Sequence, residues 1–156
     1  MGESLSIVIQ DACPSESTPP AERLRAWIGS ALQNRVRGEL TLRIVAEAES
    51  AELNSRYRGG LGPTNVLAFP AEPELPASAD EPLPCGDLVV CAAVVAREAA
   101  RQGKSAEAHW AHIVIHGALH LIGYDHESER QAKRMEDRER ALLDGFSVSD
   151  PYRERP

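Results

Sequence analysis

Four of the five histidines in this 156-residue chain fall within twelve residues, and their spacing strongly restricts the local fold. They recur at intervals of three or four residues, which places them on one face of an α-helix: His109, His112, His116 and His120. Gly123 then allows the helix to end and the chain to turn back, which brings His126 within reach of that face. The sequence therefore predicts a helix whose C-terminal end carries a cluster of imidazoles.

Three of these side chains have the spacing of a metal site. His116 and His120 are four residues apart, so their rings project side by side from successive turns. Neutral imidazoles are good zinc ligands, and three of them leave one tetrahedral position open, as a catalytic site requires. We therefore expect His116, His120 and His126 to hold one zinc ion. His109 is more simply explained as a core residue of the helix.

The same spacing occurs in the metzincin peptidases, with one difference. In their motif HExxHxxGxxH a glutamate follows the first histidine and deprotonates the zinc-bound water, whereas Gly117 occupies that position here. Glycine cannot transfer a proton. Peptide hydrolysis is therefore disfavoured, and the site requires a different substrate or a base from elsewhere in the chain.

Two residues near the cluster each have two open interpretations. Asp125 either accepts a hydrogen bond from a ligand imidazole or serves as a turn residue after Gly123. His112 either packs in the core or supports a ligand from outside the metal's own coordination shell. Both are candidates for orienting the metal ligands.

Two arginines precede a glycine-rich turn in the first half of the chain. Arg56 and Arg58 close a predicted helix that Gly59 and Gly60 terminate. Cations complement the dipole at a helix C-terminus, which accounts for both residues without any function. Alternatively, a guanidinium beside a metal can bind a phosphate through two parallel hydrogen bonds. The turn lacks the GK[ST] ending of a Walker A loop, so it is not a phosphate-binding loop of that kind.

The order of the predicted elements indicates a single α+β domain over residues 1–156. Strands are expected at Leu5–Gln10, Leu40–Ile44, Asn65–Phe69 and Gly86–Cys91. Helices are expected after Thr18 and at Ala46–Arg58, Ala92–Gln102, Ser105–Ile122 and Glu127–Leu143. This order predicts a mixed sheet of about four strands packed against about five helices, with the metal site at the C-terminal end of a central helix. Residues 71–84 are expected to form a Pro-rich acidic loop, and residues 147–156 a tail.

The charge of the chain restricts its partners. The formal net charge is −7, the pI is near 5.2, and aromatic residues make up 4% of the sequence. Such a chain does not coat nucleic acid through bulk charge or through repeated base stacking. No apolar run reaches the length of a membrane span, and the three cysteines (Cys13, Cys85 and Cys91) do not suggest a secreted disulfide framework. A cytoplasmic protein is expected.

Taken together, the two segments resemble the YbeY family of bacterial metal-dependent endoribonucleases, which act in ribosomal RNA maturation. The resemblance covers roughly Leu5 to Tyr152 and is carried by Tyr57-Arg58, Pro63–Leu67, Phe69-Pro70, Gly86–Val90 and the stretch from His109 to His126. It implies a zinc ion on His116, His120 and His126. It also implies that Arg58 is the essential residue that does not bind the metal and faces the RNA phosphate.

The resemblance implies a zinc-dependent endoribonuclease that cleaves single-stranded RNA during maturation of the small-subunit ribosomal RNA 3′ end and in ribosome quality control. The metal would lower the pKa of its bound water towards about 7 or polarise the phosphate, while Arg58 stabilises the transition state. Expected partners are ribosomal RNA, the small ribosomal subunit and ribosome-associated proteins, with neither membrane nor DNA. Two alternatives stay open: a ribosome-assembly or RNA-binding factor with a structural zinc, and a peptidase-type zinc metallohydrolase.

The chain departs from the family pattern at three positions. Gly60 and Leu61 stand where the family usually has a Lys-Asp pair, and Ala68 stands where it has serine. Without that lysine, Arg58 has one fewer cation beside it to attract RNA. We therefore expect weak, salt-sensitive binding to free RNA, with specificity supplied by the ribosome or a protein partner.

Overall fold

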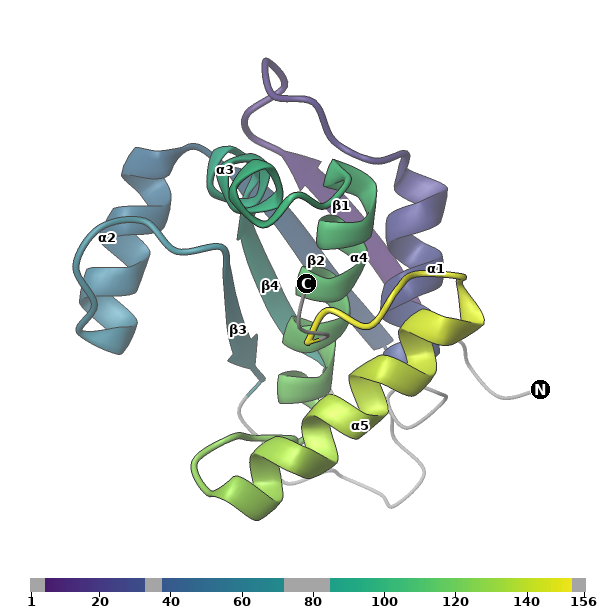
Figure 1. The fold of residues 1–156 in the computed structure, drawn as a ribbon. Coiled ribbons are helices and arrows are strands. Elements are labelled where there is room, and N and C mark those ends of the chain that lie inside the picture. The colour runs from purple at the N-terminus through teal and green to yellow at the C-terminus, as the bar shows by residue number, and fades with distance from the viewer. Residues whose placement is uncertain (1–4, 33–37, 72–84, 153–156) are drawn as a thin grey trace.

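A mixed sheet of four strands forms the centre of the protein (Figure 1). The structure, a computed structural model, describes residues 5–32, 38–71 and 85–152. The strands lie in the order β1-β2-β4-β3, with bounds β1 Leu5–Asp11, β2 Gly38–Val45, β3 Val66–Pro70 and β4 Gly86–Cys91. β1, β2 and β4 are parallel, whereas β3 pairs antiparallel with β4 at the edge.

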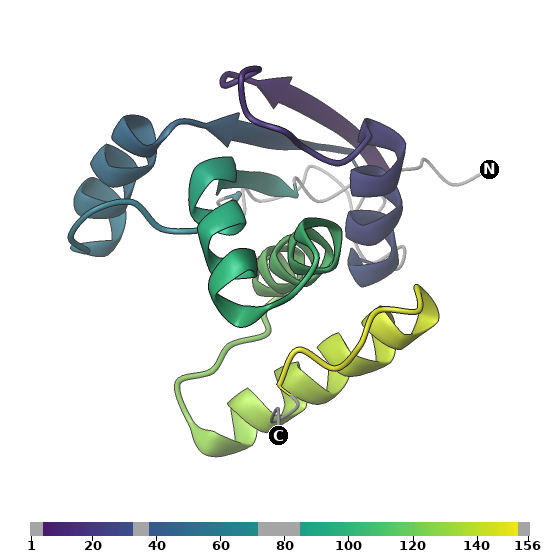
Figure 2. The ribbon, with the colours of Figure 1, turned by 45° about the horizontal axis from the view of Figure 1, so that its top comes forward.

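Helices cover one face of this sheet in two layers (Figure 2). The first layer holds α1 (Ala21–Leu32), α3 (Ala92–Gln102) and α4 (Ala106–Leu121), and α5 (Glu129–Gly145) crosses the outer side of α4. α2 (Glu47–Arg58) stands beside the sheet near β3 and packs Leu53 against the opposite face. The central helix α4 is therefore enclosed by the sheet, by α1 and α3, and by α5.

Alternation along the strands explains why the sheet has an apolar face. Leu40, Leu42 and Ile44 of β2 are buried at 0–1% exposure, and Leu88 and Val90 of β4 join them in the main core. Side chains at alternate positions of a strand point to one face, so these five residues together form the floor on which α4 packs. On the other face, Val45, Leu67 and Val89 belong to a smaller cluster.

Serine caps begin the two helices on either side of the imidazole cluster, and a glycine ends the helix that carries Arg58. The Ser105 hydroxyl accepts a hydrogen bond from the Ala108 N–H at the start of α4. Ser128 and Gln131 form a reciprocal capping box at the start of α5. Gly59, with φ of 66°, ends α2 in the left-handed conformation that glycine adopts without strain.

Gly117 lies where α4 packs closely against the side chains of β3 and β4. A Cβ at this position would lie 3.0 Å from both Leu88 Cδ2 and Val66 Cγ2, closer than well-packed carbon atoms normally come. The residue is therefore small because the helix packs directly against β3 and β4. A glutamate of the metzincin type at this position would require the side chains of Leu88 and Val66 to shift.

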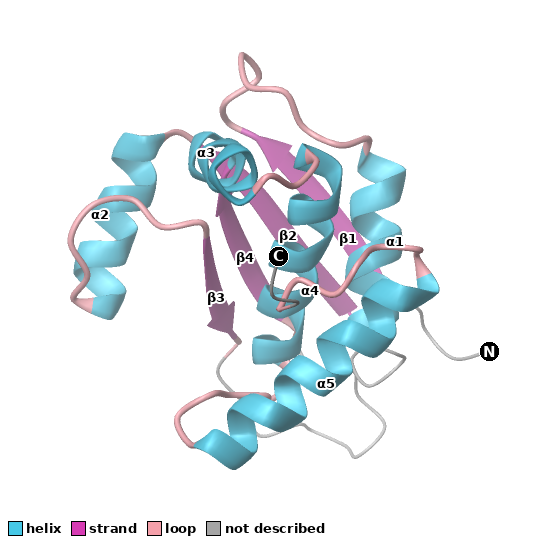
Figure 3. Ribbon diagram, viewed as in Figure 1, coloured by secondary structure: helices cyan, strands magenta, loops and turns pink. Residues whose placement is uncertain are grey.

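The expected α+β architecture is confirmed, since the described residues form four strands and five helices. Figure 3 colours them by secondary structure. The expected and observed ends of the helices differ by at most a few residues, because Ser105 and Ser128 act as caps. Of the expected acidic loop, residues 72–84 are not among the described residues. The same is true of residues 153–156 of the tail. Among the described helices, none has the length and apolar character needed to cross a bilayer.

A matched pair of helical glycines tests the close packing at Gly117. A Cβ added at Gly29 in α1 would meet no other part of the described chain within 4 Å, whereas one at Gly117 would meet two side chains at 3.0 Å. We expect Gly29→Ala to raise the free energy of unfolding by about 0.5–1 kcal/mol, because alanine is the better helix former. In Gly117→Ala, overpacking of about 1–3 kcal/mol opposes that gain, so the net effect is destabilising. Urea unfolding of both variants measures the difference, and equal stabilisation would contradict the packing described here.

Candidate metal centre

Three imidazoles meet where α4 ends. The ring centroids of His116 and His120 are 4.7 Å apart, and His126 lies 5.8 Å from the first and 5.1 Å from the second. One ring nitrogen from each lies within 4.8 Å of the other two. The sequence spacing therefore does bring these three side chains together.

The turn after α4 places His126 in this group. α4 ends at Leu121, and the Tyr124 N–H then donates to the Leu119 carbonyl at 3.0 Å, which folds the chain back on the last turn. Gly123 adopts a φ of 101°, a backbone conformation that residues other than glycine rarely adopt. The next residues then return past the helix end before α5 begins (Figure 1).

One pair of imidazole nitrogens has a separation compatible with a bound metal ion such as zinc. Nε2 of His116 and Nε2 of His120 are 3.2 Å apart. Two nitrogens bound tetrahedrally to one zinc, each at about 2.0–2.1 Å, are separated by about 3.3 Å, close to this distance. Burial, reinforced by the neighbouring His116 and His126, lowers the pKa of His120 and favours its neutral form. Neutral imidazole is the form that binds metal.

A buried carboxylate lies behind these ligands. Glu139 of α5 is fully buried, and its Oε2 lies 2.7 Å from Nε2 of His112, while its Oε1 lies 3.4 Å from Nδ1 of His116. The Tyr152 hydroxyl donates to both carboxylate oxygens, at 2.9 and 3.1 Å. Burial by itself raises the pKa of Glu139, but hydrogen bonds and charges from the two histidines outweigh it and lower the pKa to about 2. The carboxylate is therefore ionised at neutral pH.

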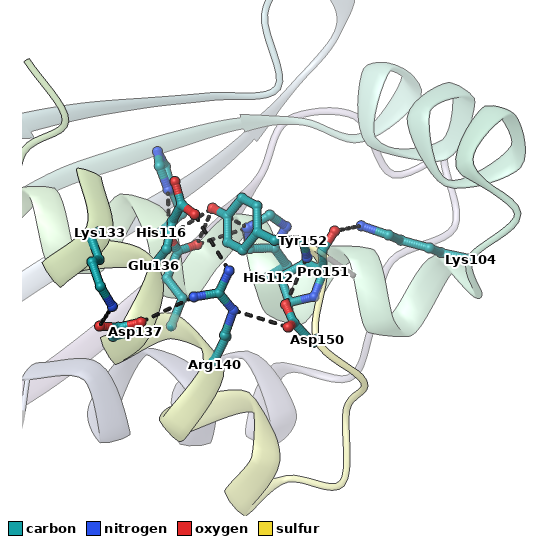
Figure 4. A network of polar contacts seen from close by, with 11 residues as sticks. Lys104, His112, His116, Lys133, Glu136, Asp137, Arg140, Asp150, Pro151 and Tyr152 are labelled. Carbon is teal, nitrogen blue, oxygen red and sulfur yellow. Dashed lines mark hydrogen bonds and ion pairs between the residues drawn. The ribbon is translucent and has the colours of Figure 1, made fainter. Parts of the chain in front are cut away.

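The segment after α5 contacts this carboxylate through the Tyr152 hydroxyl. Figure 4 shows Tyr152 together with Arg140 and Asp150. The Arg140 guanidinium lies 5.2 Å from the centre of the Tyr152 ring and donates to Asp150 at 3.0 Å. Burial, followed by the charge and hydrogen bond of Glu139, raises the pKa of Tyr152, so its hydroxyl keeps its proton and remains a donor. The part of the expected tail that the structure describes, residues 147–152, thus contributes to the site.

The sequence interpretation missed Glu139 and Tyr152. The run from Glu127 to Arg140 alternates in charge, which is typical of a solvated helix face. Glu139 nevertheless lies on the buried face of α5, because it follows Met135 by four residues and precedes Leu142 by three. An acidic residue at a helix position where the periodicity expects an apolar one was the signal in the sequence that could have identified Glu139.

His112 and His109 occupy different surroundings although both lie on α4. His112 contacts Glu139 and, at 3.2 Å, the Tyr152 hydroxyl, and its ring packs edge-on against that of His116 with 6.2 Å between the centroids. His109 is buried, and its Nε2 lies 2.8 Å from Oε1 of Glu98 on α3. Burial lowers the pKa of His109 more than Glu98 raises it. His109 is thus a core residue, as its position on the helix suggested.

Asp125 makes its hydrogen bond to the chain itself. Its Oδ1 accepts from the His126 backbone N–H at 2.7 Å. This contact stabilises the turn that carries His126, which is the role of a turn residue.

Arg58 and the histidines line one cavity of about 750 Å³. The Arg58 Nη2 donates to the Ala68 carbonyl of β3 at 2.9 Å, which holds the exposed guanidinium along that wall. Arg56, by contrast, forms an i,i+4 ion pair with Glu52 at 3.2 Å on the helix surface. The two arginines that the sequence grouped together therefore differ, and only Arg58 lines the cavity.

The turn that departs from the family pattern lies next to Arg58. Leu61 is 99% exposed, and a Cβ on Gly60 would collide with the Asn54 side chain, which donates to the Gly62 carbonyl at 2.9 Å. The Asn54 contact therefore uses the space that a side chain at residue 60 would need.

Comparison with known proteins gives a consistent match over nearly the whole chain. The model of the family described as endoribonuclease YbeY matches residues 14–147. A protein of Halorhodospira halophila named endoribonuclease YbeY is 58% identical, over 89% of this chain and 91% of its own. A Nitrosococcus oceani protein of the same name is 47% identical, over 96% of this chain and 97% of its own.

A solved structure shares the fold as well as part of the sequence. The solution structure of a Thermotoga maritima protein has a TM-score of 0.54 and 25% identity, and the match covers 96% of this chain and 99% of that one. The family match and the close relatives both span far more than half of the chain. The chain therefore belongs to the YbeY family.

Proposed function

We propose that this protein is a zinc-dependent endoribonuclease that cleaves single-stranded RNA in the maturation of the small-subunit ribosomal RNA 3′ end and in ribosome quality control. The name of its relatives supports RNA as the substrate, and the family resemblance supports ribosomal RNA. The small ribosomal subunit and its associated proteins are the expected partners, in the cytoplasm.

The observation that carries this proposal is the shared cavity. His116, His120 and His126 form one wall, and Arg58 approaches from the β3 side. A metal-binding group and a guanidinium that face the same open space suit a phosphodiester, whose oxygens accept both a cation and paired N–H donors.

Each group has a separate task. His116, His120 and His126 would hold the zinc, which when bound supplies Lewis-acid polarisation of a phosphoryl oxygen and acidifies water. Arg58 binds the phosphate and stabilises the additional negative charge of the transition state. Because Ala68 already orients the guanidinium, Arg58 loses little freedom when it binds the substrate.

Two other functions fit the site less well. A structural zinc usually has four protein ligands in a closed site, whereas His126 is exposed and the three histidines open into a large cavity. A peptidase would need a general base next to the first ligand, and this chain has Gly117 there, which cannot transfer a proton.

Metal removal provides the first test. We expect chelation to abolish cleavage of a ribosomal RNA precursor and zinc to restore it, with no cleavage of the matching DNA or of a peptide panel. His116→Ala and His126→Ala should each lose zinc and activity, because only two imidazoles would remain. Zinc content and gel-resolved cleavage are the measurements. Unchanged RNA processing in cells that carry a zinc-free His116→Ala protein would show that the metal site is not catalytic.

The two arginines of α2 allow a controlled test of the phosphate-binding role. Arg58→Ala should keep its zinc and its fold, because Arg58 is exposed, but lower kcat by about 10²–10³-fold through the loss of one transition-state donor. Arg56→Ala removes the same charge from the same turn and should leave cleavage nearly unchanged, since Arg56 pairs with Glu52. Single-turnover cleavage at saturating RNA measures the cleavage rate of each variant and so distinguishes Arg58→Ala from Arg56→Ala. Full activity of Arg58→Ala would remove this residue from the mechanism.

The charge of the chain predicts how it binds free RNA. With a net charge of −7, few cations contact phosphate, so binding should be weak and lost on a modest increase in salt. Titration of a labelled single-stranded RNA between low and physiological salt measures this. Tight binding that resists salt would contradict a site based on Arg58 and a metal alone.

A further inference from the structure

Among the residues that the structure describes, Glu139 is the one fully buried acid, and the proposed mechanism does not use it. It lies on the side of His116 opposite the metal position, because Nδ1 of His116 faces the carboxylate while Nε2 faces His120. We propose that Glu139 is a positioning residue of the metal centre, which fixes the tautomer and orientation of His116 and is itself held by His112 and Tyr152. This inference rests on the proposed zinc site.

The hydrogen-bond chemistry of Glu139 determines where the protons lie. The Tyr152 hydroxyl donates to both oxygens of Glu139, and where these oxygens accept hydrogen bonds, each ring nitrogen that faces them supplies the proton. His112 therefore carries its proton on Nε2, which agrees with its buried Nδ1 having no donor or acceptor among the described residues. For the same reason His116 carries its proton on Nδ1.

The consequence for His116 is a free lone pair on the metal side. A neutral imidazole has one protonated and one unprotonated nitrogen, so a proton on Nδ1 leaves Nε2 available. That nitrogen is the one 3.2 Å from Nε2 of His120. A carboxylate behind a ligand histidine also makes the imidazole more basic and restricts its ring rotation, and both effects strengthen metal binding.

Three donors keep the carboxylate in place. His112 and Tyr152 bond to Glu139 at 2.7–3.1 Å, shorter than the 3.4 Å contact to His116. The two shorter contacts thus anchor the carboxylate, and the longer one remains to adjust when His116 binds a metal. Arg140 holds Tyr152 over the group through its contacts with the ring and with Asp150 (Figure 4).

A different arrangement is also possible with these atoms. His112, His116 and Glu139 form a second group whose ligand atoms lie within 4.8 Å of one another, so Glu139 could itself bind the metal. This site would use Nδ1 of His116 and leave His120 and His126 without a role. The positioning role is favoured because the three-histidine group opens into the cavity with Arg58, whereas Glu139 is fully buried.

Zinc affinity of the full chain, measured by competition with a chromogenic chelator well below the melting temperature, tests the inference. We expect Glu139→Gln to bind zinc about 10–100-fold more weakly, as is typical when such a supporting partner is lost. Glu136→Gln is the matched control, since Glu136 lies on the same helix and pairs with Arg140 at 3.6 Å rather than with a histidine. Its zinc affinity should equal that of the unmodified chain.

Two further variants separate positioning from a general loss of structure. Tyr152→Phe keeps the ring but removes one donor to Glu139, so zinc affinity should fall by less than in Glu139→Gln while the fold is retained. Glu139→Asp retains the charge and should recover part of the affinity. A purely structural role predicts lower melting temperatures with unchanged zinc affinity in all three variants, and this result would overturn the inference.

The outcomes also distinguish this inference from the proposed function. If the unmodified chain binds no zinc, both are wrong. If it binds zinc and Glu139→Gln binds equally well, only the positioning role is wrong. Complete loss of zinc in Glu139→Gln, with zinc retained in His120→Ala and His126→Ala, would show that Glu139 is a ligand instead.

Discussion

Burial of α4 on every side is the constraint on which the rest of the structure depends. A helix enclosed by a sheet and three other helices should be apolar all round, yet this one carries four histidines. Burial of an imidazole costs less free energy where its polar atoms find partners. Acids from the neighbouring helices each bond to one ring nitrogen, Glu98 of α3 at His109 and Glu139 of α5 at His112 and His116, while Nδ1 of His109 and of His112 has no partner among the described residues.

This pairing also explains why the metal ligands lie at one end of the helix. His116 and His120 are partly exposed and His126 is exposed, close to the turn at Gly123. Towards the N-terminus the imidazoles face carboxylates, and towards the C-terminus they face one another. The last turn of α4 is therefore where imidazole nitrogens remain available to a ligand.

The sequence predicted the local features well, because they depend on short-range periodicity. The buried face of α1, the alternation in β2 and the end of α2 at Gly59 all follow patterns of a few residues. Strand order could not be predicted in this way, since β2 pairs with β4 across a long stretch of chain that includes β3. Glu139 was missed for a similar reason, because its partners lie on α4 and in the segment after α5.

The two walls of the cavity differ in how they are connected along the chain. The histidines, Glu139 and Tyr152 all come from one continuous stretch, a helical hairpin with its following segment, whereas Arg58 reaches the cavity only through β3 and its pairing with β4. The position of the imidazoles therefore depends on the packing of α5 against α4, whereas the position of the guanidinium depends on the edge strand β3. A change in one of these pairings alters one wall of the cavity without directly moving the other.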